Sequence, residues 1–213
     1  FSDIKKATEA LTSITNSSFK QEATVHKQLI FSHLVNNASK LYENNKFLDS
    51  SDHFESAYRL SQKDTVYLYY AASTAVSAKA YDKSLSMYEE LKTLGFTGIE
   101  KQYFATNKED QKEESFSSKV LRDVSVKSGT HMSPTDKLTD SKFPEIIKNI
   151  ALIYVDLGDN DKALEAMLLS RSENPDNVNL LLTEANVHYK MGNIEKFKEL
   201  LEMATQMDPN NAQ

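Results

Sequence analysis

Apolar residues between positions 144 and 177 recur every three or four residues, which is the spacing of one face of a helix. The apolar positions that follow this spacing on either side of Gly158 are Ile147, Ile150, Ala151, Tyr154, Leu164, Met167 and Leu168. Glycine readily adopts the backbone conformation that ends a helix and reverses the chain. The pattern therefore predicts a helix, a turn at Gly158 and a second helix.

The same pattern returns 34 residues later along the chain. The matching pairs are Ala151 and Ala185, Gly158 and Gly192, and Pro175 and Pro209. The two units span residues 144–177 and 178–211. When the places of each unit are numbered from 1 to 34, the small residue is at place 8, glycine at place 15 and proline at place 32. A fixed period of this length is typical of a repeat array.

Two further units fit the same numbering. An Asp-Lys pair at positions 82 and 83 aligns with one at 161 and 162, which places a unit at residues 65–98, and one more step of 34 residues gives a unit at 31–64. Both units have alanine at place 8 but lack proline at place 32. At place 15 they have Asn45 and Lys79 instead of glycine. Asparagine tolerates a left-handed backbone and lysine does so poorly, so the turn at Lys79 is the weakest match to the pattern.

These four units resemble the tetratricopeptide repeat, whose pattern has small residues at places 8, 20 and 27, an aromatic or apolar residue at 24, glycine at 15 and proline at 32. The resemblance implies an all-α fold, a tetratricopeptide-like α-solenoid of antiparallel helix pairs. Small residues at places 8 and 20 let two helices approach closely, and each unit buries its apolar face against its neighbours.

Residues 99–143 fit no 34-residue register and form an insert. "QYFATN" and "ESFSS" predict a small β-hairpin, "SSKVLRDVSVKSG" predicts a short helix capped by Ser117 or Ser118, and "THMSPTDKLTDS" is expected to be a mobile loop. We expect the insert to be ordered, because apolar side chains can bury against the neighbouring units, and to contribute to partner choice. Those side chains are Tyr103, Phe104, Phe116, Val120, Leu121 and Val124.

Residues 1–30 predict a helical segment that belongs to an incomplete repeat. Ile4, Ala7, Leu11 and Ile14 mark one amphipathic helix. A second helix begins near Phe19 and continues without a breaker to Tyr42, so the first helix of the unit at 31–64 should be unusually long. Since the pattern starts partway through a helix, we expect Phe1 to be a fragment boundary or the visible start of a longer array.

Charge and composition narrow the classes of partner. The chain has 31 acidic and 25 basic residues, a net charge of −6, and no basic stripe that would indicate binding to nucleic acid. No apolar run approaches the roughly 20 residues that a membrane span needs. The absence of cysteine excludes disulfides and thiolate nucleophiles. Because the chain starts at Phe1 instead of methionine, a signal peptide or lipid anchor could have been removed.

No motif predicts catalysis, a cofactor or a metal. The histidines show no metal-ligand spacing; they are His26, His33, His53, His131 and His188. Asp159 and Asp161 are spaced as in a calcium loop, but the glycine and final glutamate of such a loop are out of place, so a turn and helix cap is the better interpretation. The chain also lacks a glycine-rich phosphate loop and a nucleophile elbow. We therefore expect a protein that is not an enzyme.

The resemblance also implies a concave groove, into which places 2, 5, 9, 12 and 13 of each unit point. Here these places include Tyr42, Glu43, Tyr69, Ser73, Lys148, Leu152, Asn186, Tyr189 and Lys190. Their tyrosine, asparagine and lysine side chains suit an extended peptide, through stacking and hydrogen bonds, although ordinary solvated positions would look the same. No unit combines lysine at place 5 with asparagine at place 9, so a chaperone-type carboxylate clamp is disfavoured.

The leading hypothesis is a non-enzymatic adaptor, a solenoid whose groove and insert bind another protein within a larger cell-envelope assembly. "YFATN", and "VKSGTH" followed by "NIALIY", resemble tetratricopeptide proteins of Bacteroidota that carry export signals. That resemblance implies a periplasmic or outer-membrane-associated location and leaves a cytoplasmic one open. The alternative function is a binding protein for a glycan or other small ligand that uses the groove tyrosines, and an enzyme ranks third.

Overall fold

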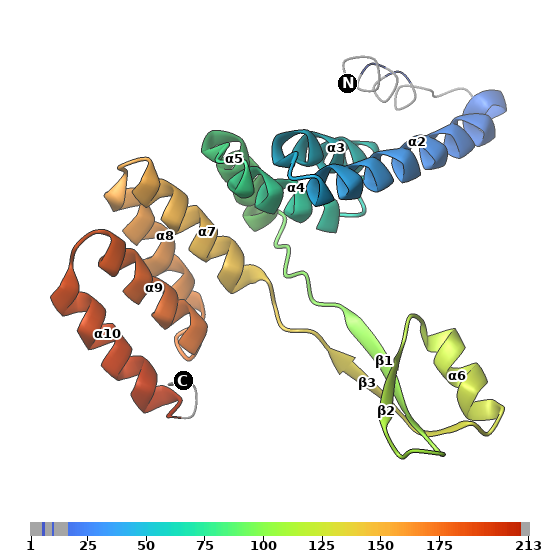
Figure 1. Ribbon diagram of the computed structural model, residues 1–213. Helices are drawn as coiled ribbons and strands as arrows, with labels where there is room; N and C mark the ends of the chain where they lie inside the picture. Colours follow the sequence, from blue (N-terminus) through green and yellow to red (C-terminus); the bar gives the residue numbers. More distant parts are fainter. Residues whose placement is uncertain (1–5, 7–9, 11–16, 210–213) are drawn as a thin grey trace. The chain divides into compact units, whose positions relative to one another are not determined.

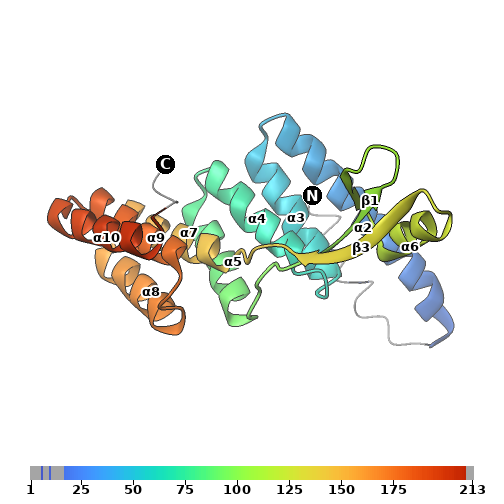
Figure 2. The same cartoon turned by 90° about the horizontal axis from the view of Figure 1, so that it is seen from below.

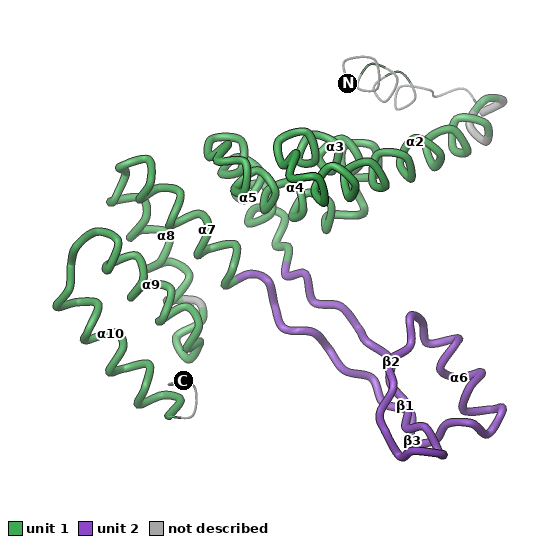
Figure 3. The backbone as a smooth tube through the Cα atoms, in the orientation of Figure 1, with its two compact units in different colours: residues 1–96, 144–213 green, residues 97–143 purple. Residues whose placement is uncertain are grey.

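The computed structural model describes Lys6, Ala10 and residues 17–209. The helix expected through Ile4 and Ile14 lies outside the described residues. Two compact units make up the chain: a helical unit, formed by residues 1–96 and 144–213, and an insert unit, formed by residues 97–143 (Figure 3).

The helical unit consists of helices joined by short turns, as the 34-residue pattern predicts (Figure 1). The described helices of this unit are α2 (Ser17–Glu43), α3 (Phe47–Leu60), α4 (Val66–Ser77), α5 (Tyr81–Thr93), α7 (Phe143–Asp156), α8 (Asn160–Glu173), α9 (Val178–Lys190) and α10 (Ile194–Met207). Helix α2 is unusually long at 27 residues, which confirms the uninterrupted helix expected up to Tyr42. The predicted all-α solenoid with a small insert is confirmed.

Small residues allow the helices of a pair to pack closely. The alanines at place 8, which are Ala38, Ala72, Ala151 and Ala185, are all fully buried. In the first two units the serine at place 20 is buried as well, and its hydroxyl donates to the carbonyl of the place-8 alanine, from Ser50 to Ala38 over 2.8 Å and from Ser84 to Ala72 over 2.9 Å. A buried hydroxyl needs such an acceptor, and the close approach supplies it.

The turn at place 15 has the same geometry in all four units. Asn45, Lys79, Gly158 and Gly192 all have positive φ angles, of 58°, 56°, 82° and 79°. The next residue's N–H donates to a carbonyl five residues back in each case, as from Lys46 to Leu41 over 2.8 Å and from Asp159 to Tyr154 over 2.8 Å. This bond satisfies a carbonyl at the helix end. Lys79 therefore adopts the left-handed conformation that the repeat requires and for which lysine is poorly suited.

Replacing Lys79 with glycine should stabilise the array. A left-handed backbone costs a residue with a Cβ about 1–2 kcal/mol, and glycine loses part of that gain to its larger chain entropy, so we expect an increase of about 0.5–1 kcal/mol in the free energy of unfolding. The matched control is Gly158→Ala, where a new Cβ would meet nothing within 4 Å and only the backbone would be strained. Thermal melts by circular dichroism should show opposite shifts; a K79G variant no more stable than wild type would contradict the prediction.

The insert unit contains a three-stranded antiparallel sheet and one helix, α6 (Lys119–Lys127). The strands are β1 (Lys101–Asn107), β2 (Glu113–Phe116) and β3 (His131–Leu138), in the order β2-β1-β3, and α6 lies beside them in both views (Figure 1, Figure 2). The predicted hairpin of β1 and β2 is confirmed. Helix α6 is also confirmed, with the Ser118 hydroxyl accepting from the Leu121 N–H over 3.3 Å.

The prediction that "THMSPTDKLTDS" is a loop is wrong, because most of it forms β3. Strand β3 pairs with the free edge of β1, and the pairing contains a β-bulge: Phe104 faces Thr135 and Thr106 faces Met132, so two residues of β3 oppose one of β1. Ser133 takes a left-handed φ of 50° in this bulge. Proline, which cannot donate to a ladder, is tolerated at a bulge, and Pro134 occupies this one.

The expectation that α6 buries its apolar residues is also wrong. Val120, Leu121 and Val124 are 70%, 53% and 57% exposed. Helix α6 instead turns Arg122 inward, where its guanidinium contacts the Asp136 carboxylate, donates to the Thr135 carbonyl over 3.2 Å and lies 5.6 Å from the centre of the Tyr103 ring. A buried charge requires partners of this kind, and the sequence pattern does not reveal them.

Candidate functional site

Three residues predicted for the groove meet at one hollow in the helical unit. This hollow has a volume of about 360 Å³ and is formed by α2, α3 and α4. Its lining residues are Ser39, Tyr42, Glu43, Phe54, Tyr70, Ser73 and Thr74. Tyr42, Glu43 and Ser73 are among the predicted positions. We call this site the aromatic hollow.

Helical spacing brings the lining residues together. Tyr42 and Glu43 lie in the last turn of α2, and Ser39 lies one turn before them. Tyr70, Ser73 and Thr74 are three and four residues apart on α4, so they share one face of that helix. Phe54 comes from α3, which packs against both α2 and α4.

The rings of the aromatic hollow are held by other rings but remain accessible. The centre of the Tyr70 ring lies 5.6 Å from that of Phe54 and 6.0 Å from that of Tyr67, and the Tyr42 ring lies 5.4 Å from Phe47. These separations are typical of favourable aromatic pairs. Tyr42 is nevertheless 50% exposed and Tyr70 40% exposed, so both present apolar surface to a ligand without needing to rearrange.

Tyr69 does not belong to the groove surface, and this corrects the sequence prediction. It is only 6% exposed, and its hydroxyl donates to the Glu145 carboxylate over 2.8 Å. Burial, and then the bond to Glu145, hold the pKa of Tyr69 well above its usual range, so the phenol stays a neutral donor. The ring connects α4 to α7 inside the helical unit.

A second buried tyrosine makes a similar connection. The Asn149 side chain on α7 donates to the Tyr88 hydroxyl on α5 over 2.9 Å, and burial raises the pKa of Tyr88 to about 12. Together with the bond between Tyr69 and Glu145, this contact joins helices on the two sides of the insert in the sequence. These two side-chain hydrogen bonds thus link the second unit of the array to the third.

The remaining predicted groove residues lie apart from the aromatic hollow, on α7 and α9. Lys148 and Leu152 are half-buried on α7, while Asn186 is exposed on α9. Tyr189 is 58% exposed and packs against Phe197 at 5.1 Å between ring centres. Lys190 forms an ion pair of 3.0 Å with Asp156. Of these residues, Tyr189 offers the largest accessible apolar surface.

Sequence reasoning missed Phe54, Tyr70 and Thr74 as lining residues. Tyr70 and Thr74 occupy places 6 and 10 of their unit, each one place after a position assigned to the groove. Phe54 belongs to a second helix, whereas the family resemblance assigns the groove to first helices. The place-9 serines Ser39 and Ser73 are 34 residues apart, and this periodicity is the signal that could have located the hollow between two units.

The aromatic residues predicted for the insert are all engaged within that unit. Phe116 packs edge-on against His131 at 5.1 Å, Tyr103 lies under Arg122, and Phe104 lies 4.6 Å from the Lys137 ammonium. The His131 ring also contacts the Glu114 carboxylate at 3.0 Å. These rings stabilise the small sheet and are half-buried.

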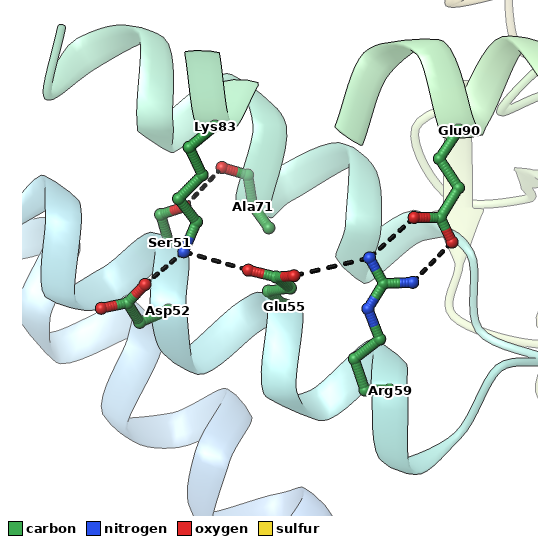
Figure 4. A network of polar contacts seen from close by, with 7 residues as sticks. All are labelled: Ser51, Asp52, Glu55, Arg59, Ala71, Lys83 and Glu90. Carbon is green, nitrogen blue, oxygen red and sulfur yellow. Dashed lines mark hydrogen bonds and ion pairs between the residues drawn. The ribbon is translucent and has the colours of Figure 1, made fainter. Parts of the chain in front are cut away.

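A network of charged side chains joins the second helices of the first two units (Figure 4). Lys83 on α5 contacts Asp52 and, at 3.0 Å, Glu55 on α3, while Arg59 on α3 donates to Glu90 on α5 over 2.7 Å. The bond to Glu90 raises the pKa of Arg59, and the bond to Arg59 lowers the pKa of Glu90. This network connects α5 to α3, the helix that also carries Phe54.

Among residues 17–209, no three histidine, aspartate or glutamate side chains gather in a way that could hold a metal ion. None of the helices described there combines the length and the apolar character of a membrane span.

Comparison with protein-family models matches residues 154–213 to the family described as tetratricopeptide repeat. Residues 154–213 therefore contain tetratricopeptide repeat sequence. A tetratricopeptide repeat protein from Parabacteroides merdae has a similar fold, with a TM-score of 0.54 at 15% identity over 98% of this chain and 62% of that one. A MamA structure designated MSR-1 C2 gives a TM-score of 0.50 at 10% identity over 97% of this chain and 95% of that one.

These identities are low, so the similar structures define the fold of the tetratricopeptide array and not its partner. The chain spans 62% of the length of the Parabacteroides protein. Parabacteroides belongs to the Bacteroidota, the group whose tetratricopeptide proteins the insert motifs resemble. A comparison with curated proteins found no match.

Proposed function

We propose that this tetratricopeptide array is a non-enzymatic adaptor that binds an extended segment of another protein in the groove containing the aromatic hollow. The fold supports a protein-interaction role in general. The observation that carries the proposal is the aromatic hollow itself, in which two accessible tyrosines and a buried phenylalanine converge between neighbouring units.

The chemistry of the hollow suits a peptide. Tyrosine provides a large contact area with few rotatable bonds, so little conformational entropy is lost on binding. Tyr70 and Tyr42 are also held by neighbouring rings, which makes the surface preorganised. Tyr189 extends the accessible aromatic surface to α9, so a partner segment could contact more than one unit.

We further propose that the protein works in the cell envelope, in the periplasm or at the outer membrane, as one subunit of a larger assembly. The support is the resemblance of the insert motifs to exported Bacteroidota proteins. Fractionation of the source cells tests this location, and recovery in the cytoplasmic fraction alone would contradict it.

A small-ligand function is the second candidate, and the size of the aromatic hollow favours it. Ligand sites usually have volumes of about 300–1,000 Å³, and the aromatic hollow, at about 360 Å³, falls in this range. A sugar ring stacked on Tyr42 or Tyr70 would be the expected pose. Oligosaccharides that raise the melting temperature would favour this function, because a ligand that binds only the folded state stabilises it.

Photo-crosslinking from defined positions tests the adaptor proposal. We would place a benzoylphenylalanine at Tyr42 or Tyr189 and, as a control, at Leu168, which is 61% exposed on the second helix α8. Irradiation in the source cells should give the same protein adduct from both groove positions and not from Leu168. The Tyr42 adduct should decrease in a Tyr70→Ala variant. If no protein adduct depends on position, the adaptor proposal is wrong.

The same method tests the contribution of the insert. Val120 on α6 is 70% exposed and can carry the crosslinker without disturbing the Arg122 contacts. An adduct with the groove partner from this position would mean that the insert also touches the partner. If only groove positions react, recognition lies in the groove alone.

A further inference from the structure

We propose that the aromatic hollow receives a positively charged side chain, arginine or lysine, from the partner segment. This inference rests on the proposed adaptor function and specifies which partner segments the groove selects. Three features of the hollow support it: its charge, its hydrogen-bonding character and its aromatic faces.

The charge of the hollow is negative. Glu43 is the only carboxylate or basic group among its lining residues. Within the described part of the chain, no other residue forms an ion pair or hydrogen bond with the Glu43 side chain. Glu43 is also the last residue of α2, and the carbonyl end of a helix favours cations. Both contributions attract a positively charged guest.

The hydroxyl groups of the hollow can offer acceptors to a guest. The Ser39 hydroxyl donates its proton to the Val35 carbonyl over 3.2 Å, and the Thr74 hydroxyl donates to the Tyr70 carbonyl over 2.6 Å. Because a hydroxyl has one proton, the remaining lone pairs of Ser39 and Thr74 can only accept. With the Glu43 carboxylate, they form a set of acceptors that suits a donor-rich guest. An ammonium offers three donors and a guanidinium five.

The aromatic rings complete the site. Tyr42, Phe54 and Tyr70 line the same hollow as Glu43, and the face of an aromatic ring attracts a cation electrostatically. The aliphatic part of an arginine or lysine side chain also fits against these rings. One guest can therefore satisfy the rings and the carboxylate at once.

An acidic guest does not fit the aromatic hollow. The basic residues Lys40 and Lys46 line a different hollow, together with Asn37, Leu41, Asn44 and His53. Within the aromatic hollow a carboxylate would meet Glu43 and no positive charge. The array should thus select basic segments and reject acidic ones.

Blocked nine-residue peptides of alanine, glycine and serine, with one variable central residue, test this proposal. The central residue would be arginine, lysine, citrulline or glutamate, and binding would be followed by NMR of the isotope-labelled protein. We expect the arginine and lysine peptides to shift the amide signals of residues 39–43 and 70–74. Citrulline has nearly the shape of arginine without its charge, so its peptide should bind about tenfold more weakly. The glutamate peptide should not bind.

The variant Glu43→Gln should weaken binding of the arginine peptide about tenfold while keeping the fold. Glu202→Gln, at an exposed position on α10, is the matched control and should bind like wild type. Equal binding of the arginine and citrulline peptides would overturn the proposal, as would unchanged affinity in Glu43→Gln or the absence of any shift at the hollow. These results would leave the adaptor function standing, because the crosslinking experiment decides that function independently.

Discussion

Replacing Arg171 with methionine should lower the free energy of unfolding by about 3 kcal/mol. Arg171 on α8 donates to the Glu184 carboxylate on α9 over 2.6 Å, and the Glu184 side chain is only 6% exposed. Methionine keeps much of the aliphatic volume of arginine but leaves a buried charge without its partner. We place the effect at the lower end of the usual range for broken buried ion pairs because Arg171 itself is 25% exposed.

Two further variants separate charge from packing at this position. Glu184→Gln removes the buried charge and should cost less than Arg171→Met. The double variant Arg171→Met with Glu184→Met should recover most of the loss, since replacing both members of a buried pair by apolar groups is often nearly neutral. Urea unfolding followed by circular dichroism measures all three. A loss below about 1 kcal/mol in Arg171→Met would show that solvent screens this pair as it does surface pairs.

Replacing Ala151 or Ala185 with leucine should also destabilise the array, by about 1–3 kcal/mol for each variant. Both alanines occupy place 8 and are fully buried. Ala185 lies in a core with Leu181, Leu200 and Ala204, where α9 and α10 meet. A leucine has no room there without separating the two helices.

The neighbouring position provides the control for these leucine variants. Asn186 follows Ala185 on the same helix and is exposed, so Asn186→Leu should change the melting temperature little. Thermal melts compare the three variants with wild type. If Ala185→Leu melts at the same temperature as Asn186→Leu, the 34-residue register would place the wrong residue at the helix contact.

The repeats could be predicted from the sequence because each place of the 34-residue pattern has one local structural requirement. Place 8 needs a small side chain at a helix contact, and place 15 needs a left-handed backbone, whichever unit is considered. Lys79 shows how strong this requirement is, since it adopts a φ of 56° without being glycine. Local requirements of this kind produce a periodic pattern of residue types along the sequence.

Contacts between residues far apart in the sequence produce no such periodic pattern, and the predictions that depend on these contacts are wrong. The place of Tyr69 in its unit predicts a groove position, but its partner Glu145 lies 76 positions away, beyond the insert. The proline and polar residues of β3 predict a loop, whereas pairing with β1 and the bulge at Ser133 make it a strand. The local sequence does not indicate that Arg122 is buried, because its partner Asp136 lies on another element.

The candidate site was partly predictable for a related reason. Tyr42, Glu43 and Ser73 lie on first helices, to which the resemblance assigns the groove, and all three line the aromatic hollow. Phe54 was not found, since it reaches the aromatic hollow from a second helix and only the packing of α3 against α2 and α4 brings it there. The 34-residue period locates positions along the chain, whereas the shape of the aromatic hollow depends on the arrangement of α2, α3 and α4.

The two ends of the insert are hydrogen-bonded to each other, and this has an evolutionary consequence. Lys142 donates its N–H to the Thr97 carbonyl over 2.7 Å, and Thr139 donates to Glu100 over 2.9 Å. A segment that starts and ends at neighbouring points can change in length at little entropic cost. Mutation can therefore lengthen, shorten or exchange the segment between Glu100 and Thr139 while the spacing of the tetratricopeptide units is inherited unchanged.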